Sequence, residues 1–368
     1  MFVQHTLSLD KIPKKIRRKL RVLKIEGYNP AEIRYMRKTK NHPNLHKASE
    51  KSPKMGFTKI HDFLQNEFFE RHKFSTMDNH IKQKRTFKDR LHMIPIILQG
   101  VGAGRGMIFR QYRHLSRNKR VDKDAYEQLD GKQLWKEMET YAREKWGIQK
   151  IGFTEVPRDI IFQGRHILFK YALVFIEEMR KPYIDDAPHL KAGFETMRAY
   201  NHLGKTVLDI AQWLRKKGIR TQANHPLGGL VSFVPLAGKA GLGWQGMNGL
   251  LVTQEFGIRQ RIAPIFIEHP IFEFTDKVPL EHNWIEDYCK TCKICYTECN
   301  ENATDAIQEE KTIYNNEIPT IGRLARALDP VKCFPMFSRF VGCSLCIKVC
   351  PFSQGPGVYE KIKRKFVK

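Results

Sequence analysis

The sequence predicts a mixed α/β or α+β domain followed by a cysteine-rich, metal-binding module. Helical and strand patterns alternate through residues 126–275, as expected for a packed unit of that class. All eight cysteines lie between Cys289 and Cys350. Pro270 and Pro279 interrupt the chain between these two parts, which places their boundary near residue 275. With the segment that precedes the α/β patterns, we expect three regions: 1–125, 126–275 and 276–368.

Apolar periodicity places the elements of the middle region. Residues 126–146 and 190–217 carry apolar side chains every three or four positions, which predicts two helices. Gly218 is expected to end the longer one, since glycine adopts the left-handed conformation of a helix C-terminus easily. Strands are expected over 148–154, 167–176, 219–223, 250–253 and 262–268.

The first quarter of the chain is strongly basic. The formal net charge is +25, and residues 1–90 hold 23 Lys and Arg against nine Asp and Glu, an excess of 14. Such a segment can bind tRNA or another nucleic acid, an anionic membrane surface or an acidic protein, or it can be a solvated arm. Net charge alone leaves the role of residues 1–125 open.

Nothing in the sequence indicates a membrane span or an export signal. The most apolar stretch, 93–109, is shorter than the ~20 residues that a span needs and is interrupted by Gln99 and Arg105. Arg17 and Arg18 precede charged residues rather than an apolar segment. We therefore expect a cytoplasmic protein, with peripheral membrane contact as an alternative.

The cysteines form two runs, which read Cys289-x2-Cys292-x2-Cys295-x3-Cys299 and Cys333-x9-Cys343-x2-Cys346-x3-Cys350. Thiolates at every third position wrap three corners of a cubane, and the fourth cysteine of such a run binds the neighbouring cluster. The spacing therefore predicts a ferredoxin-like module with two [4Fe-4S] clusters. One would be held by Cys289, Cys292, Cys295 and Cys350, and the other by Cys299, Cys333, Cys343 and Cys346.

Two other interpretations of the cysteines fit less well. Zinc ribbons usually separate two C-x2-C pairs, and disulfides would be spread along a secreted chain. The first run departs from the ferredoxin pattern, because Asn300 rather than proline follows Cys299, whereas Pro351 follows Cys350. Proline is not a ligand, so we expect a changed turn and not a lost cluster.

Two glycine-rich segments are candidates for ligand contact. The segment Gly100–Gly106 lacks the spacing of a dinucleotide-binding motif, and we interpret it as a flexible basic loop. In the second, Gly241, Leu242, Gly243, Trp244 and Gly246 would let the backbone approach a flat or phosphate-bearing ligand. The alternative there is a tight turn between two strands.

From about residue 166 to 357 the chain resembles the corrinoid-dependent reductive dehalogenases and the related epoxyqueuosine reductases. The resemblance rests on ALVFIEEM (172–179), the helix from Tyr200 to Gly218, the run AGLGWQGMNGLLVTQEFGIRQR and the paired cysteine runs. It implies a nitroreductase-like core that binds base-off cobalamin beside two [4Fe-4S] clusters. Cob(I)alamin would be the reactive species, and Gly241, Leu242, Gly243, Trp244 and Gly246 would line the corrinoid.

The same resemblance implies a catalytic trio. A tyrosine on the long helix would donate a proton, a basic residue would favour its ionised form, and an asparagine would lie near the leaving halide. Tyr200, Arg259 and Asn224 match these positions, with Arg261 an equal candidate for the basic residue. The context of Asn224 departs from the usual Asn-Asp, since His225 follows it.

Three functions remain open on the sequence. The first is an oxidoreductase of the dehalogenase type that takes electrons from a donor such as ferredoxin or flavodoxin and reduces a small molecule. The gap between Cys333 and Cys343 and the short tail after Cys350 favour it. The second is an epoxyqueuosine reductase acting on tRNA, and the third is a non-catalytic electron carrier. The sequence does not identify the substrate or the oligomeric state.

Overall fold

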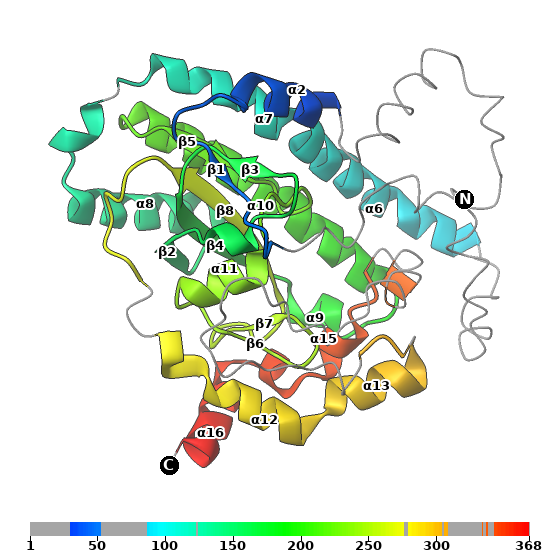
Figure 1. Ribbon diagram of the computed structural model, residues 1–368. Helices are drawn as coiled ribbons and strands as arrows, with labels where there is room; N and C mark the ends of the chain where they lie inside the picture. The colour runs from blue at the N-terminus through cyan, green and yellow to red at the C-terminus, as the bar shows by residue number, and fades with distance from the viewer. Residues whose placement is uncertain are drawn as a thin grey trace.

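The computed structural model describes residues 30–52, 87–122, 124–275, 279–303, 305–307, 333, 336–337 and 342–367 (Figure 1). The elements before the central sheet are α2 (Pro30–Thr39), β1 (His46–Lys47), α6 (Phe87–Arg105), the π-helical turn η2 (Gly106–Arg110), α7 (Gln111–Arg113), and the 3-10 turns η3 (His114–Arg120) and η4 (Ala125–Gln128). Within the described ranges no helix has the length and apolar character to span a bilayer.

A four-stranded sheet forms the centre of the molecule. Its order is β2 (Ile151–Glu155), β4 (Tyr171–Glu178), β8 (Gln260–Ile267), β5 (Thr221–Ala223), and all neighbours are antiparallel. The strand expected over 167–176 is divided in two, because β3 (His166–Ile167) pairs with β1 and only β4 joins the sheet. The strand expected near 250 lies outside the sheet, in a hairpin. An antiparallel sheet makes this domain α+β.

The two faces of the sheet are covered by different elements, because successive side chains of a strand point to opposite faces. Leu173, Phe175, Ala263 and Ile265 pack with α8 (Gly131–Trp146) and α10 (Leu190–Lys216). Val174, Ile176, Ile262 and Phe266 pack instead with β3, Tyr35 of α2 and α11 (Phe233–Lys239). The expected long helix is confirmed as α10, and Gly218, with φ 95°, follows its end.

The segment Gly100–Gly106 is helical, so its interpretation as a flexible loop is wrong. It forms the end of α6 and the start of η2, and α6 packs along α10. A Cβ atom at Gly102 would lie 2.8 Å from Asn201 Oδ1, and one at Gly106 would lie 2.8 Å from the His225 ring. Glycine therefore permits close helix packing here, and that packing outweighs the low helix propensity of glycine.

The cysteine-rich module lies below the sheet in the view of Figure 1. Its described elements are η6 (Pro279–His282), α12 (Trp284–Cys292), α13 (Ile294–Asn302), α15 (Leu345–Val349), η8 (Pro351–Gln354) and α16 (Pro356–Phe366). The hairpin of β6 (Trp244–Gln245) and β7 (Leu251–Val252) lies between sheet and module. A shared apolar cluster joins α10, the hairpin and the module through Ala199, Trp244, Val252, Trp284 and Phe352. The short elements η5 (Arg158–Ile160) and α9 (Lys181–Ile184) complete the described structure.

Candidate functional site

The two cysteine motifs fold alike. Lys293 follows Cys292 and Ser344 follows Cys343, so the two residues occupy equivalent positions of the motif. Both have a left-handed backbone, with φ 48° and 58° respectively, which is uncommon for residues other than glycine. The same local turn therefore recurs in both motifs although their sequences differ.

One quartet of cysteines surrounds a cavity. Cys289, Cys292, Cys295 and Cys350 all line it, together with Met247 of the hairpin and Phe352 of η8. Cys350 belongs to the second motif, so the last cysteine of that motif lies with the first three of the other. Two-cluster ferredoxins show the same arrangement, in which the fourth cysteine of one run is a ligand of the other cluster.

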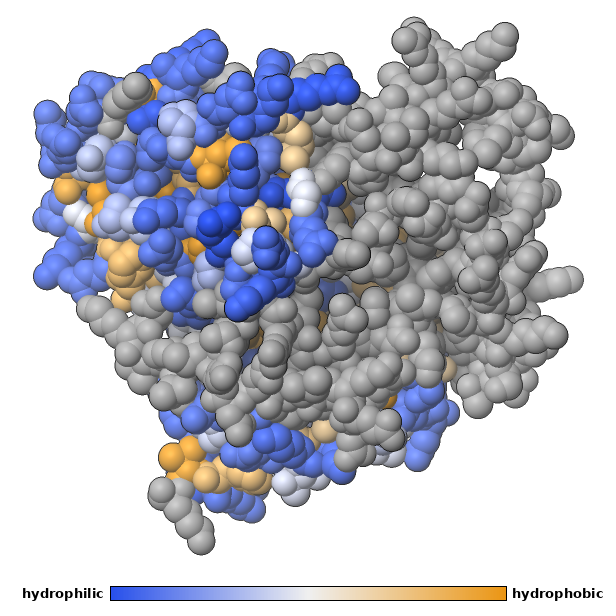
Figure 2. Space-filling view, in the orientation of Figure 1, coloured by the Kyte–Doolittle hydropathy of each residue, from blue (hydrophilic) through white to orange (hydrophobic). Residues whose placement is uncertain are grey.

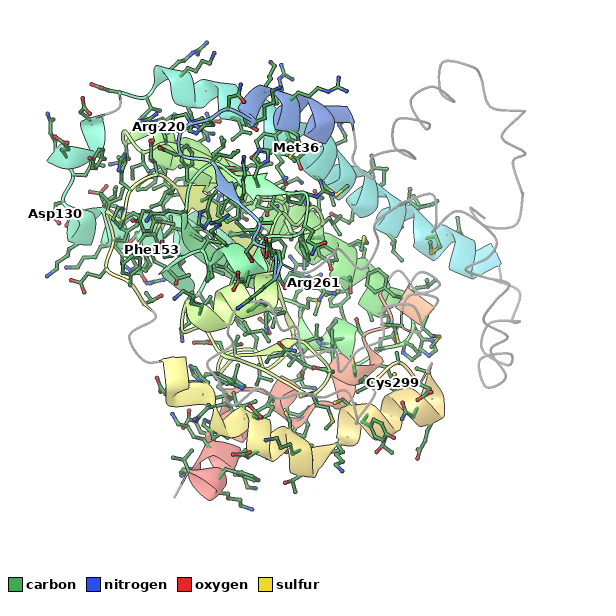
Figure 3. The ribbon with its side chains drawn as sticks, in the orientation of Figure 1. Met36, Asp130, Phe153, Arg220, Arg261 and Cys299 are labelled. Atoms are coloured by element: carbon green, nitrogen blue, oxygen red, sulfur yellow. The ribbon has the colours of Figure 1, made fainter. Side chains whose placement is uncertain are left out.

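The second quartet lies in an adjoining apolar cluster. Cys299, Cys333, Cys343 and Cys346 pack there with Met336 and Leu345, and the cluster reaches Cys289 and Cys295 of the first quartet. Figure 3 shows Cys299 on α13, in the lower part of the molecule. The two quartets are therefore neighbours, and none of the eight cysteines forms a disulfide.

Burial controls the protonation of these thiols. It raises the pKa of Cys343 to about 11 and that of Cys295 to about 12, in each case with a smaller contribution from neighbouring cysteines. It also raises the pKa values of Cys346 and Cys350. Protein alone therefore keeps these groups as neutral thiols, and iron would have to displace their protons. Among the described residues, no three or more His, Cys, Asp or Glu side chains form a group able to hold a single metal ion.

The glycine run forms the hairpin and touches the first quartet. Trp244 pairs with Val252 and Gln245 pairs with Leu251. A Cβ atom at Gly243 would lie 2.0 Å from the Val252 carbonyl oxygen, so strand pairing itself demands this glycine. At Gly246 a Cβ atom would lie 3.7 Å from Cys289 Sγ. The run is thus a tight turn between two strands, as in one of the two interpretations, and its tip adjoins the cysteine cavity.

Tyr200 lies half-buried on α10, one residue from Ala199 of the shared apolar cluster. The guanidinium carbon of Arg261 lies 4.8 Å from the centre of the Tyr200 ring. Arg261 is the second residue of β8, an inner strand of the sheet, and lies at the end of that strand nearer the module (Figure 3). The structure therefore brings Arg261, of the two candidate arginines, against the tyrosine.

Arg259 makes a different set of contacts. Its Nη1 atom donates to Glu178 Oε1 at 2.6 Å and to the Met179 carbonyl at 2.8 Å, and its Nε atom donates to the Ser353 carbonyl at 2.7 Å. The side chain is 5% exposed. Because Ser353 belongs to η8, Arg259 links the sheet to the cysteine-rich module.

Asn224 is buried in the turn after β5. Its Nδ2 atom donates to the Gly228 carbonyl at 2.5 Å, and its Oδ1 atom accepts from the Leu230 amide at 2.9 Å. Both polar atoms therefore hold the loop 224–230. This is the role of a turn residue, and none of these hydrogen bonds reaches Tyr200.

Sequence reasoning overlooked two polar residues near the tyrosine. Glu177 is paired in register with Arg261 and binds Arg198 and His202 of α10, at 2.9 and 2.6 Å. Gln260 donates to the Leu251 carbonyl of the hairpin at 2.5 Å, while its Oε1 atom and the Nε atom of Arg261 are buried without a hydrogen-bond partner among the described residues. The sequence does hold a signal for these residues: Glu177-Glu178 directly follows one predicted strand, and Arg259-x-Arg261 directly precedes another.

Known proteins resemble this chain over part of its length. A tetrachloroethene reductive dehalogenase of Desulfitobacterium hafniense is 28% identical over 191 residues, which is 50% of this chain and 33% of that protein. Epoxyqueuosine reductase of Escherichia coli (strain K12) is 29% identical over 126 residues, or 33% of this chain and 29% of that protein. The chain thus matches about a third of the length of these curated relatives. No family model matches it.

A solved structure shows the same limited similarity. It is a reductive dehalogenase structure, reported to suggest a mechanism for B12-dependent dehalogenation. The alignment covers 60% of this chain and 32% of the dehalogenase chain, at 18% identity and a TM-score of 0.48. The two sequence relatives make the chain similar, over part of its length, to reductive dehalogenases and epoxyqueuosine reductases.

Proposed function

We propose that this protein is an oxidoreductase of the dehalogenase type, which uses two [4Fe-4S] clusters and a corrinoid to reduce a small organic substrate. The observation that carries the proposal is the convergence of three features. A quartet of cysteines surrounds one cavity, the glycine hairpin adjoins that cavity, and Tyr200 with Arg261 lies where the sheet, α10 and the hairpin meet.

Both cysteine quartets fit iron–sulfur clusters. Each supplies four thiols from two motifs, and thiolates are the soft ligands that such clusters require. When bound, the clusters supply single electrons and the corrinoid supplies a strongly reducing cobalt centre. Because the quartets adjoin, electrons from a donor protein such as a ferredoxin or flavodoxin would have a short path between them.

The hairpin region fits a large polar cofactor. Gly246 leaves the backbone bare beside the first quartet, and two buried polar atoms nearby, Gln260 Oε1 and Arg261 Nε, lack partners among the described residues. Unpaired buried polar atoms are costly unless a ligand or water satisfies them. Gly241, Leu242, Gly243, Trp244 and Gly246 would hold the corrinoid from the hairpin side, with Gln260 and Arg261 as additional contacts.

Tyr200 would supply the proton. Replacing a carbon–halogen bond by a carbon–hydrogen bond consumes two electrons and one proton and releases halide. The phenol holds that proton at its Oη atom, and the positive charge of Arg261 over the ring stabilises the phenolate that remains. Of the two candidate arginines, Arg261 thus takes the role of the basic residue, and Asn224 shapes the adjacent loop.

Anaerobic purification with measured iron, sulfide and cobalt content tests the cofactor assignment. We expect iron–sulfur absorbance and retention of added cobalamin. Loading of iron and sulfide with no retained corrinoid would refute the enzyme and support a plain electron carrier.

The variant Tyr200→Phe tests the proton donor. It should lower turnover about 10²–10⁴-fold, the usual contribution of a positioned acid, and leave the bound-corrinoid spectrum unchanged. A turnover close to wild type would exclude Tyr200 as the donor. Tyr126→Phe, at a half-buried tyrosine on η4, serves as the matched control.

Epoxyqueuosine reduction is the second candidate, and the similarity to the Escherichia coli enzyme favours it. It predicts salt-sensitive tRNA binding and turnover of epoxyqueuosine in tRNA. Parallel assays with halogenated organic compounds and with epoxyqueuosine-containing tRNA separate the two activities. Product from the tRNA alone would replace the dehalogenase assignment.

A further inference from the structure

A run of arginines follows α6 on the side of the molecule away from the cysteines. Residues 105–120 hold six Lys and Arg and no Asp or Glu. Arg105 ends α6, and residues 106–120 form η2, α7 and η3; the side chains of Arg110, Arg113 and Arg117 are exposed. Figure 2 shows hydrophilic residues over this upper edge, where Figure 1 places α2 and α7.

Several of these cations converge on one point. Burial and the charges of Arg117, Arg215, Arg110 and Arg113 lower the pKa of His114 to about 4. Arg215 comes from the end of α10, so two separate segments supply the charge. No ion pair joins Arg110, Arg117 or Arg215 to a carboxylate of the described residues. Like charges held close together favour binding of an anion.

The cluster is held in place by buried polar contacts. Asn118 of η3 donates to the Thr221 carbonyl at 2.8 Å and accepts from the Thr221 amide at 3.1 Å, which fixes η3 to β5. Arg117 donates to Gln212 Oε1 at 2.9 Å, and Arg215 donates through Nη1 to Thr221 Oγ1 at 2.6 Å. These bonds position the guanidinium groups before any ligand arrives.

Arg215 supplies the independent sign of a ligand. Its side chain is 8% exposed, and its Nη2 atom is buried without a partner among the described residues. The Nδ1 atom of His114 is likewise unpartnered. A buried guanidinium N–H group without an acceptor is costly, and a phosphate oxygen is the acceptor that its geometry suits well.

The shape of the surface favours an extended polyanion. The end of α2, which packs against α7, adds the exposed side chains of Arg37, Lys38 and Lys40 to the cluster. The exposed large apolar side chains of the described residues lie elsewhere, on 91–101 of α6, at Ile294 and at the end of α16. A membrane-inserting surface would present such side chains among the cations, whereas a phosphodiester backbone needs only the cations.

We propose that Arg110, Arg113, Arg117 and Arg215, extended by the end of α2, form a sequence-independent binding site for the phosphates of a nucleic-acid strand. The site is separate from the cysteine quartets and from Tyr200. It does not depend on the redox function proposed above, since a strand could bind whichever substrate is reduced.

Fluorescence anisotropy with a short labelled single-stranded RNA of mixed sequence tests this site on the full chain. The double variant Arg110→Gln/Arg117→Gln removes two exposed cations, and the matched control Lys361→Gln/Arg364→Gln removes two from α16. Each lost phosphate contact should reduce the slope of log K against log salt by about 0.7. We expect a slope shallower by about 1.4 and roughly tenfold weaker binding for the first variant, with the control close to wild type.

Three outcomes would overturn the proposal. The first is equal weakening by both variants, which would indicate general charge attraction. The second is unchanged binding in the arginine variant. The third is an unchanged RNA affinity combined with lost binding to anionic phospholipid vesicles, which would identify a lipid surface. Unchanged thermal unfolding of both variants confirms that the fold is intact.

Discussion

Arg259 and Arg261 offer a direct test of how the site is built, because the structure gives them different tasks. Arg259 links β4, β8 and η8 through three hydrogen bonds, one of them to the Glu178 carboxylate. Arg261 lies over the Tyr200 ring. We compare the variants Arg259→Gln and Arg261→Gln, each of which removes one guanidinium group.

The expected loss of stability in Arg259→Gln can be worked out from these contacts. Breaking a buried ion pair by removing one partner costs about 3–5 kcal/mol, as the remaining charge and carbonyl groups lose their partners. Glu178 is 36% exposed, so water screens part of this loss, and we expect about 3 kcal/mol. That corresponds to a Tm lower by roughly 6–12 °C. Arg261→Gln should change Tm by only about 1–2 °C on the same scale and lower turnover at least about tenfold.

Differential scanning calorimetry of the cofactor-loaded protein and steady-state turnover measure the two effects. The corrinoid spectrum confirms loading of each variant. Full stability of Arg259→Gln combined with a loss of turnover would identify Arg259 as the basic residue that assists Tyr200. Normal turnover of Arg261→Gln would show that the guanidinium over the ring does not assist the tyrosine.

Three further changes test separate parts of the structure. Cys346→Ser removes one ligand of the second quartet, so the iron content should fall by about half while the first quartet still loads, and full iron content would contradict the assignment. In Gly204→Ala the new Cβ atom would lie 2.0 Å from His225 Nε2, and we expect about 1–3 kcal/mol of destabilisation by chemical unfolding. In the control Gly104→Ala the new Cβ atom would have no heavy atom within 4 Å, so this variant should stabilise α6 by up to about 1 kcal/mol. A change of the same sign in the free energy of unfolding of both variants would refute the packing argument. Burial lowers the pKa of His166 to about 4, so the unfolded state binds more protons between about pH 4 and 6.5, and the free energy of unfolding falls as the pH falls through that window. His166→Gln should flatten this dependence by up to about 1.4 kcal/mol per pH unit, and an unchanged slope would show that His166 titrates normally.

Local patterns determined several parts of this protein. The apolar spacing along 190–217 predicted α10 with its end at Gly218, because helix periodicity depends only on near neighbours in the chain. The spacing of the cysteines is also a local pattern, and it predicted two quartets in which the last cysteine of each run belongs to the quartet of the other run. A three-residue spacing gives the same turn wherever it occurs, as Lys293 and Ser344 show.

Tertiary structure decided what local patterns could not. The glycines of α6 indicate a loop by propensity, but Asn201 and His225 lie where Cβ atoms would be, and close packing makes the segment helical. Arg259 and Arg261 are two residues apart, so strand periodicity sends both toward the same face. Only the register of β4 against β8, which pairs Glu177 with Arg261, and the position of η8 assign one arginine to the tyrosine and the other to the module. Likewise, the sequence shows a cluster of arginines between 105 and 120, but only folding brings Arg215 to them from the end of α10, since their proximity depends on contacts between segments about a hundred residues apart.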